Sequence, residues 1–193
     1  ASAGTCTGAP PFAATESTLY EIGSISKVFT TSLLAVLEAE GRVAEGDTLS
    51  RVLPEARLSR GVGAMSLVDL ATHTSGMPRM PTNWIAPDRS QPRAPYDRAE
   101  LFAFLGSFTP SRPPGARFEY SNVGSGVLGV ALAAAAESSY EDLLTSRLLG
   151  PLGLGETHLL VPEDARARMA LGQDGSGVAI FPRRYMPVLA GCC

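Results

Sequence analysis

The sequence predicts a globular α+β domain in which helices predominate. Apolar residues make up 45% and charged residues 18% of the 193 residues, a composition typical of a folded domain rather than a disordered or fibrous chain. Several segments show helical hydrophobic periodicity with capping signals at their ends. Only residues 19–22 and 178–181 have the pattern of short strands. The length suits a single domain, although one or two subdomains would also fit.

Residues 1–18 are predicted to be loop or linker, because they are small and polar, contain Pro10 and Pro11, and lack a sustained hydrophobic period. A helix is predicted over residues 24–40, where Gly41 is placed to end it. Because charge is strong only at the C-terminal end of this helix, we expect it to be largely buried with its N-terminus in an interior cleft. Its apolar residues in register are Val28, Phe29, Leu33, Val36 and Leu37.

Further helices are indicated by their caps. Ser66 and Asp69 resemble a capping box that opens a short helix ended by Gly76. Asp97 and Glu100 indicate the start of another capped helix. The other predicted spans are 97–108, 123–137, 140–149 behind Ser138 or Ser139, and a less regular one near 163–170. Between them, residues 77–96 contain five prolines and are predicted to form a long loop.

Composition argues against several classes of partner. The formal charge of −3 comes without a basic run, so we expect no nucleic acid to bind. The longest weakly polar stretch, residues 124–136, is shorter than the roughly 20 residues of a transmembrane helix, so no transmembrane segment is predicted. Cys6, Cys192 and Cys193 form neither an even disulfide set nor a metal-ligand pattern. Two histidines without clustered cysteines or carboxylates predict no zinc site, and no cofactor is implied.

Lys27 is the only lysine in the chain. The other residues among the 16 Lys and Arg are all arginine. A buried lysine can lose its proton and act as a base, whereas arginine stays protonated. Ser24 precedes Lys27 by three residues, nearly one helical turn, so both side chains project from the same side of the helix. Free N–H groups in this first turn can stabilise a developing oxyanion. The pair predicts an activated serine nucleophile, but this spacing also occurs often by chance.

A second motif, Tyr120-Ser121-Asn122, lies directly before a predicted helix. A phenol can transfer a proton when a nearby cation lowers its pKa, and a carboxamide can both donate and accept hydrogen bonds. Tyr120 and Asn122 are therefore candidates for proton transfer and substrate binding.

Together, Ser24-Ile25-Ser26-Lys27 and Tyr120-Ser121-Asn122 resemble the serine β-lactamase and penicillin-recognising superfamily, of the class C β-lactamase, D-alanyl peptidase and family VIII carboxylesterase type. Neighbouring segments are similar to the same superfamily. These segments are EIGSIS at 21–26, THTSGMP at 72–78, PPGARFEYSN at 113–122 and YEDLLTSRLLGPLGLG at 140–155.

The resemblance implies a β-lactamase/transpeptidase-like α/β sandwich with an inserted helical subdomain. Residues 1–193 are then expected to form a partial domain, mostly its helical part, with sheet strands missing at both ends. Residues 19–193 hold the nucleophile helix and helical subdomain.

The resemblance also implies a mechanism in which Ser24 forms an acyl-enzyme. Lys27 and Tyr120 move the proton, and Asn122 holds the amide oxygen of the substrate. The substrate is a small molecule or peptide, with β-lactam, D-alanyl peptide and short acyl ester all open, and the loop 77–96 is expected to help select it. A periplasmic, cell-envelope or secreted location follows from the same resemblance.

Other functions stay open because the sequence departs from the family pattern. The third active-site motif, Lys or His followed by a small residue and Gly, does not occur after Asn122. A catalytically silent binding or scaffolding module and an inactive fragment are the alternatives, and a helical interaction domain with accidental motifs is a third. A Ser-His-Asp triad using His73 or His158 is disfavoured, because no G-x-S-x-G motif surrounds any serine. For His73 we expect a structural hydrogen bond instead.

Overall fold

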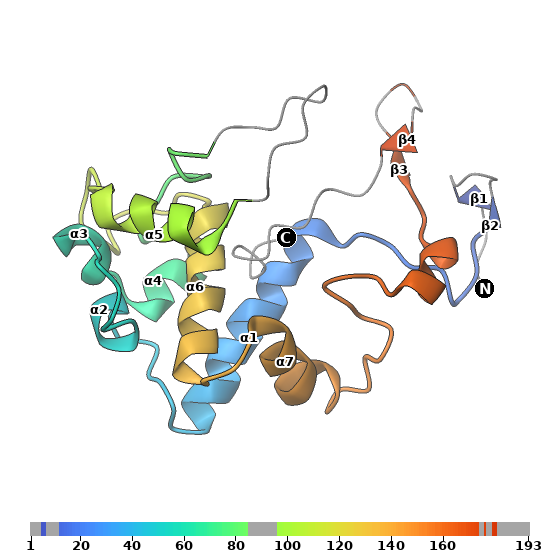
Figure 1. Cartoon of the computed structure of the whole chain (residues 1–193), viewed down its shortest axis with the longest axis horizontal. Coiled ribbons are helices and arrows are strands. Elements are labelled where there is room, and N and C mark those ends of the chain that lie inside the picture. The colour runs from blue at the N-terminus through green and yellow to red at the C-terminus, as the bar shows by residue number, and fades with distance from the viewer. Residues whose placement is uncertain (1–4, 7–11, 85–95, 174–175, 177–178, 181–193) are drawn as a thin grey trace.

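Two central helices, α1 (Ser26–Ala39) and α6 (Asn122–Ala135), pack against each other at the middle of the molecule (Figure 1). The computed structural model describes residues 5–6, 12–84, 96–173, 176 and 179–180. α7 (Tyr140–Leu144) packs against both central helices. The helices on the opposite side of α6 are α2 (Leu49–Val52), α3 (Arg60–Gly63), α4 (Leu67–Ala71) and α5 (Arg98–Ser107).

The strands in the described part of the chain are short. β1 (Thr5–Cys6) pairs antiparallel with β2 (Phe12–Ala13). β3 (Gly172–Gln173) pairs antiparallel with β4 (Ala179–Ile180). β4 falls within the predicted strand 178–181, of which the first and last residues lie outside the described ranges. Helices thus predominate, as predicted.

The N-terminal region differs from its prediction in two ways. Residues 1–18, predicted as loop or linker, contain the strands β1 and β2, because their backbones pair with each other despite the lack of a hydrophobic period. The predicted strand at 19–22 is reduced to one parallel bridge between Leu19 and Met169. Among the described residues, no strand lies beside this segment to extend its pairing beyond that bridge.

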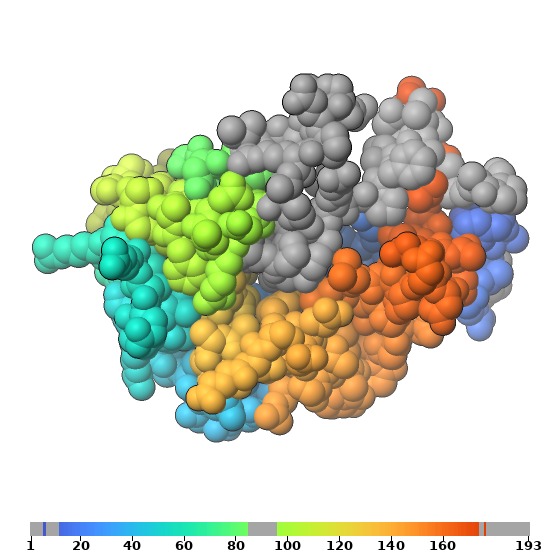
Figure 2. All heavy atoms as spheres, viewed as in Figure 1, coloured from blue at the N-terminus to red at the C-terminus, as the bar shows by residue number. Residues whose placement is uncertain are grey.

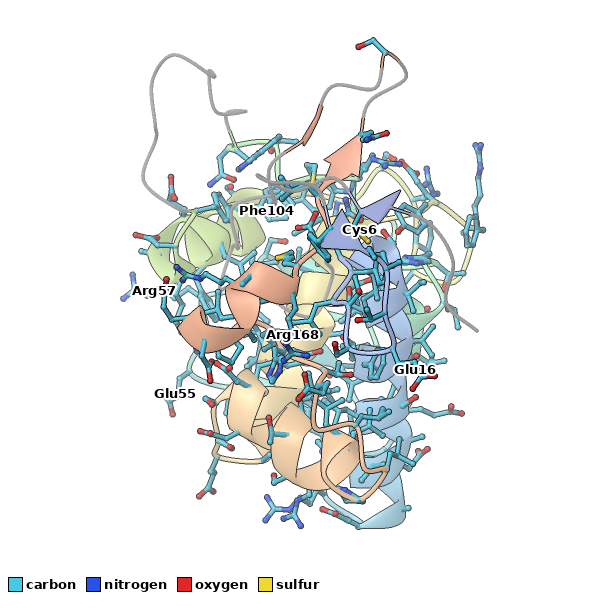
Figure 3. All side chains as sticks on the ribbon, turned by 90° about the vertical axis from the view of Figure 1, so that its right-hand side faces the viewer. Cys6, Glu16, Glu55, Arg57, Phe104 and Arg168 are labelled. Atoms are coloured by element: carbon cyan, nitrogen blue, oxygen red, sulfur yellow. The ribbon has the colours of Figure 1, made fainter. Side chains whose placement is uncertain are left out.

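Arg168 joins the C-terminal part of the described chain to the N-terminal segment. It ends a 3₁₀ helix (Glu163–Arg168), which replaces the less regular helix predicted near 163–170. Its Nη1 donates to the carbonyl of Ser17 at 2.9 Å and its Nη2 to the carboxylate of Glu156 at 2.5 Å (Figure 3). Figure 2 shows this orange segment packed beside the blue N-terminal segment.

The hydrophobic core lies between the helices and consists mainly of leucine. Burying one such side chain contributes about 1.5–3 kcal/mol, so this set supplies a large part of the stabilisation. The largest fully buried side chains are Phe104, Leu33, Leu37, Leu49, Met65, Leu67, Leu70, Met77, Leu101, Leu105, Leu128 and Leu132.

The predicted helix 24–40 begins as a 3₁₀ turn (Gly23–Ile25) and continues as α1. Gly41 ends it as expected, with a φ of +70° in the left-handed region that glycine tolerates. The N–H of Arg42 then bonds to the carbonyl of Leu37 at 2.9 Å, which satisfies an acceptor of the last turn.

One apolar residue of α1 does not face the core. Leu33 and Leu37 are fully buried, but Val28 is 61% exposed. The buried face also contains Lys27 and Thr30, and at 3.6 residues per turn Val28 projects almost opposite to it. The apolar register predicted for this helix was therefore wrong at its N-terminal end.

α4 has the predicted capping box but a different end. Ser66 Oγ accepts from the N–H of Asp69 at 3.2 Å, and the Asp69 carboxylate accepts from the N–H of Ser66 at 3.0 Å. The helix stops at Ala71, well before Gly76, because His73 adopts a left-handed φ of 61°. The expectation that Gly76 ends this helix was wrong.

The caps of α5 and α7 agree with the sequence predictions, whereas the cap of α6 had not been predicted. Asp97 and Glu100 form the predicted capping box at the start of α5. Ser121 caps α6, accepting from the N–H of Gly124 at 2.8 Å. Ser139 caps α7, which continues into a π-helical turn (Thr145–Leu149) within the predicted span.

The predicted loop 77–96 is only partly described. Residues 77–84 form neither helix nor strand, as expected, and residues 85–95 lie outside the described ranges.

Candidate active site

Ser24 and Lys27 come together as their spacing predicts. Lys27 lies in the first turn of α1, and its Nζ donates to Ser24 Oγ at 3.1 Å. The Lys27 side chain is buried, whereas Ser24 in the preceding 3₁₀ turn is exposed. A serine hydroxyl accessible to solvent is thus held against a buried amine.

Gly23 sets the direction in which the chain enters this turn. Its φ is +52°, and an added Cβ there would meet no atom within 4 Å, so the backbone conformation rather than space favours glycine. The carbonyl of Gly23 accepts from Ser26 Oγ at 2.7 Å. Both features fix Ser24 at the N-terminal end of α1.

Tyr120 reaches the same serine from a distant part of the chain. Its Oη donates to Ser24 Oγ at 2.7 Å, and Lys27 Nζ lies 4.9 Å from the centroid of its ring. Three of the four predicted site residues therefore form one hydrogen-bonded cluster. The Arg79 guanidinium lies at 5.4 Å from the same ring, on a loop for which sequence analysis assigned no site residue.

The pKa of Tyr120 lies below its ordinary value of 10.0. Burial raises this pKa, but hydrogen bonding with Lys27 and Ser24 and the positive charges of Lys27 and Arg79 outweigh burial. The surroundings therefore make this phenol more acidic than an ordinary tyrosine.

Asn122 is the first residue of α6, two positions after Tyr120. Its backbone N–H donates to the carbonyl of Arg79 at 2.9 Å, and its Nδ2 lies 3.6 Å from Met80 Sδ. Its Oδ1 is buried and has no hydrogen-bond partner among the described residues. An acceptor of this kind can bind a donor from a ligand.

Residues 73–79 hold the segment that carries Tyr120. The N–H of Glu119 donates to the carbonyl of His73 at 2.7 Å. Ser121 donates from its N–H to His73 Nδ1 at 3.3 Å and from its Oγ to the carbonyl of Pro78 at 2.7 Å. Two sequence segments that each resemble the superfamily are thus bonded to one another beside Ser24.

The structure does not form the Ser-His-Asp alternative. His73 Nδ1 accepts from the Ser121 amide, which is the structural hydrogen bond expected of it. Burial and the positive charge of Lys27 lower the pKa of His73. His158 is exposed, and no hydrogen bond from it to Ser24 is found in the described ranges.

Within the described ranges, no group of three or more His, Cys, Asp or Glu side chains is arranged to hold a metal ion. Over the same ranges, the helices lack the length and apolar character needed to cross a bilayer.

Comparison with known sequences gives a consistent group of relatives. A family model described as Beta-lactamase matches residues 7–185. A β-lactamase of Lysobacter lactamgenus is 32% identical over 161 residues, which are 83% of this chain and 39% of that protein. The D-alanyl-D-alanine-carboxypeptidase/endopeptidase AmpH of Escherichia coli is 30% identical over 160 residues, covering 80% of this chain and 40% of AmpH. The chain therefore spans less than half the length of these relatives.

Solved structures give the same result. A class C β-lactamase in complex with cefoxitin superimposes with a TM-score of 0.82 at 28% identity, covering 95% of this chain and 49% of that one. A D-alanine carboxypeptidase AmpC from Burkholderia cenocepacia has a TM-score of 0.78 at 26% identity, covering 97% of this chain and 52% of its own.

Proposed function

Because this chain belongs to the β-lactamase family, we propose that it carries the nucleophile and proton-transfer residues of a serine hydrolase acylated by esters or amides. It has part of the α+β fold of class C β-lactamases, and it covers 49% of one of them. The observation that supports the proposal most directly is the pair of hydrogen bonds at Ser24 Oγ, at 3.1 Å to Lys27 and 2.7 Å to Tyr120.

In the proposed reaction, Ser24 Oγ attacks the substrate carbonyl and gives up its proton. Lys27 and Tyr120 are both within reach of that proton, and the lowered pKa of Tyr120 favours the phenolate that accepts it. The same phenol then returns the proton to the leaving group, and water releases the acyl group from Ser24. The N-terminal end of α1 favours negative charge on the attacked oxygen.

Asn122 is proposed to bind the amide of the substrate. Its buried Oδ1, without a partner in the described residues, can accept the substrate N–H. Its Nδ2 can turn from Met80 Sδ, a weak acceptor, to the substrate's amide oxygen.

The substrate class is proposed from the relatives. β-Lactamases and a D-alanyl-D-alanine carboxypeptidase/endopeptidase are among them, so a β-lactam and a D-alanyl peptide are the first compounds to test. A short acyl ester is the third. A periplasmic, cell-envelope or secreted location is proposed on the same basis.

A catalytically silent binding module is the second candidate function. The Lys/His-small-Gly motif does not occur after Asn122 in the given sequence, which spans 39% of the β-lactamase of Lysobacter. This candidate function requires that the whole protein also lacks the motif. An inactive fragment fits the same observations.

Intact-mass spectrometry separates these functions. The chain, and a fusion that supplies the remaining half of a class C β-lactamase, are each incubated with a penicillin and with an activated ester. We expect one acyl adduct that is lost in Ser24→Ala and retained in Ser32→Ala, which removes a hydroxyl further along α1. No adduct on a folded fusion would favour the silent module, and an adduct on the fusion alone would identify this chain as an inactive fragment.

A further inference from the structure

His73 occupies a backbone position that usually belongs to glycine. It directly follows the C-cap of α4 with a φ of 61°, and the N–H of Thr74 closes the helix end by bonding to the carbonyl of Asp69 at 2.9 Å. Glycine dominates this left-handed position because it has no Cβ, although histidine is among the residues that tolerate it. Helix termination alone therefore does not require an imidazole here, and an unusual backbone conformation often accompanies a functional side chain.

The imidazole contacts both Tyr120 and the peptide that follows it. Its ring centroid lies 4.6 Å from that of Tyr120 at an interplanar angle of 44°. Its Nδ1 accepts from the N–H of Ser121 at 3.3 Å, and its edge contacts Phe118 at 5.8 Å and 90°. On the backbone side, the carbonyl of His73 accepts from the N–H of Glu119 at 2.7 Å. Residues 118–121 are thus held by one histidine through two hydrogen bonds and two ring contacts.

The hydrogen bond at Nδ1 requires a neutral imidazole with its proton on Nε2. Lys27 and Arg79 are the cations nearest to the Tyr120 ring that His73 contacts, and Lys27 disfavours a further positive charge on the imidazole. The acidic groups on the adjoining elements are engaged elsewhere. Asp69 bonds within the capping box of α4, and Glu119 pairs with Arg112.

We propose that His73 is a positioning residue that orients the Tyr120 phenol toward Ser24 and Lys27. Only the expected effect of His73 on acylation rests on the proposed function. The orientation of Tyr120 itself can be measured without any substrate. A histidine that merely ends α4 would leave that orientation unchanged when replaced by glycine.

The first test measures the pKa of Tyr120 by NMR on the chain with ¹³C-labelled tyrosine, using Tyr120→Phe to assign the signal. In His73→Gly the helix end is favoured, but the imidazole is gone. We expect this variant to stay folded, because glycine favours the left-handed helix end and offsets part of the lost contacts, while the pKa of Tyr120 rises toward 10 as the phenol leaves Lys27. His73→Asn offers an acceptor to Ser121 and tolerates the left-handed backbone, so the Tyr120 pKa is expected to stay near that of the original protein.

Two further variants complete the design. Glu137→Gly is the matched control, because Glu137 has the same left-handed conformation after the C-cap of α6, with a φ of 52°, and is exposed. It is expected to leave Tyr120 unchanged. His73→Phe keeps a ring but lacks the acceptor, and it is expected to resemble His73→Gly. If His73→Gly does not fold, the Tyr120 pKa values of His73→Asn and His73→Phe are compared instead, and their difference tests the proposal.

The second readout is the rate of Ser24 acylation, which is expected to fall about 10-fold or more in His73→Gly and to be largely restored in His73→Asn. Burial and Lys27 lower the pKa of His73, so the imidazole becomes protonated only at a pH below its ordinary value. In that more acidic range the log of the acylation rate is expected to fall more steeply in the original protein than in His73→Asn, which cannot titrate.

An unchanged Tyr120 pKa in both His73→Gly and His73→Phe would overturn the proposal. A Tyr120 pKa that changes by the same amount in His73→Asn and His73→Phe would overturn it as well. If the Tyr120 pKa responds as expected but Ser24 is never acylated, the positioning role stands and the proposed hydrolase function fails.

Discussion

At the scale of single residues, the central feature is a phenol beside two cations. Lys27 Nζ and the Arg79 guanidinium lie 4.9 Å and 5.4 Å from the centroid of the Tyr120 ring. Lys27 is buried and also bonds to Ser24, whereas Arg79 is exposed and acts on Tyr120 only through its charge. The two cations can therefore be tested separately.

Arg79→Gln is expected to raise the pKa of Tyr120, because one of the charges that favour the phenolate is removed. At pH 7 a smaller fraction of Tyr120 is then ionised, so acylation of Ser24 slows severalfold while its rate at high pH is retained. The pH dependence of acylation by an activated ester measures this shift. Arg60→Gln removes the same charge from α3 and is the control. An identical pH profile for both variants would exclude the effect of Arg79.

Lys27→Arg is expected to abolish acylation, with a loss of about 100-fold or more. Arginine keeps the positive charge, but its larger planar head does not fit the site of the buried amine that bonds to Ser24. It would therefore disturb the hydrogen-bonded geometry of Ser24 and Tyr120. Stopped-flow measurement with an activated ester checks this result, and circular dichroism checks the fold. Retained acylation in a folded Lys27→Arg protein would contradict the proposed role of the lysine.

The contacts of the site residues differ in how well the sequence predicts them. The contact of Ser24 with Lys27 follows from local helical spacing, so residue types alone predict it. The contact of Tyr120 with Ser24 joins residues 96 positions apart, and only the family resemblance placed them together. Arg79 was missed because the position of its side chain depends on the hydrogen bonds of an irregular loop. No hydrophobic period in the sequence indicates the conformation of such a loop.

At the scale of helices, boundaries set by side-chain caps were predicted well. Asp97 and Glu100 form the expected box at the start of α5, and Gly41 ends α1. The end of α4 was mispredicted, because the left-handed residue that ends the helix is His73, whereas Gly76, also left-handed, lies three residues further along. Side-chain caps act over three residues and are visible in sequence, whereas a non-glycine left-handed residue depends on tertiary contacts.

Asp97→Ala is expected to lower the free energy of unfolding by about 1 kcal/mol, because the N–H of Glu100 loses its acceptor at 2.8 Å. For a chain of this length, that corresponds to a decrease of roughly 2–4 °C in Tm. Asp97→Ser keeps a capping oxygen and should recover most of the loss. Thermal unfolding followed by circular dichroism measures both variants, and equal Tm values for Ala and Ser would show that the cap contributes nothing.

At the scale of the whole molecule, the α+β class and its helical excess followed from composition and periodicity, whereas the relation to class C β-lactamases needed the motifs. The structure adds an exposed apolar surface, of which only Val28 had been predicted to lie on a buried helix face. This Ser24-side surface consists of Tyr20, Ile22, Ile25 and Val28, which are between 41% and 61% exposed. It adjoins Ser24 at the start of α1, and the chain matches only 48% of a class C β-lactamase.

The chain on its own is expected to self-associate through the Ser24-side surface, because exposed apolar groups favour removal from water. Sedimentation velocity should show an average mass that rises with protein concentration. The double variant Ile25→Thr, Val28→Thr keeps β-branched shapes but adds hydroxyl groups, so it should stay monomeric at higher concentration. Leu152→Thr, which changes a leucine that is 62% exposed and lies far along the sequence, is the control and should associate like the original chain.

If all three proteins are monomeric over the same concentration range, the exposed surface is too small or too dispersed to drive association. If Leu152→Thr alone prevents association, the attraction lies at the other exposed leucines and not at the start of α1.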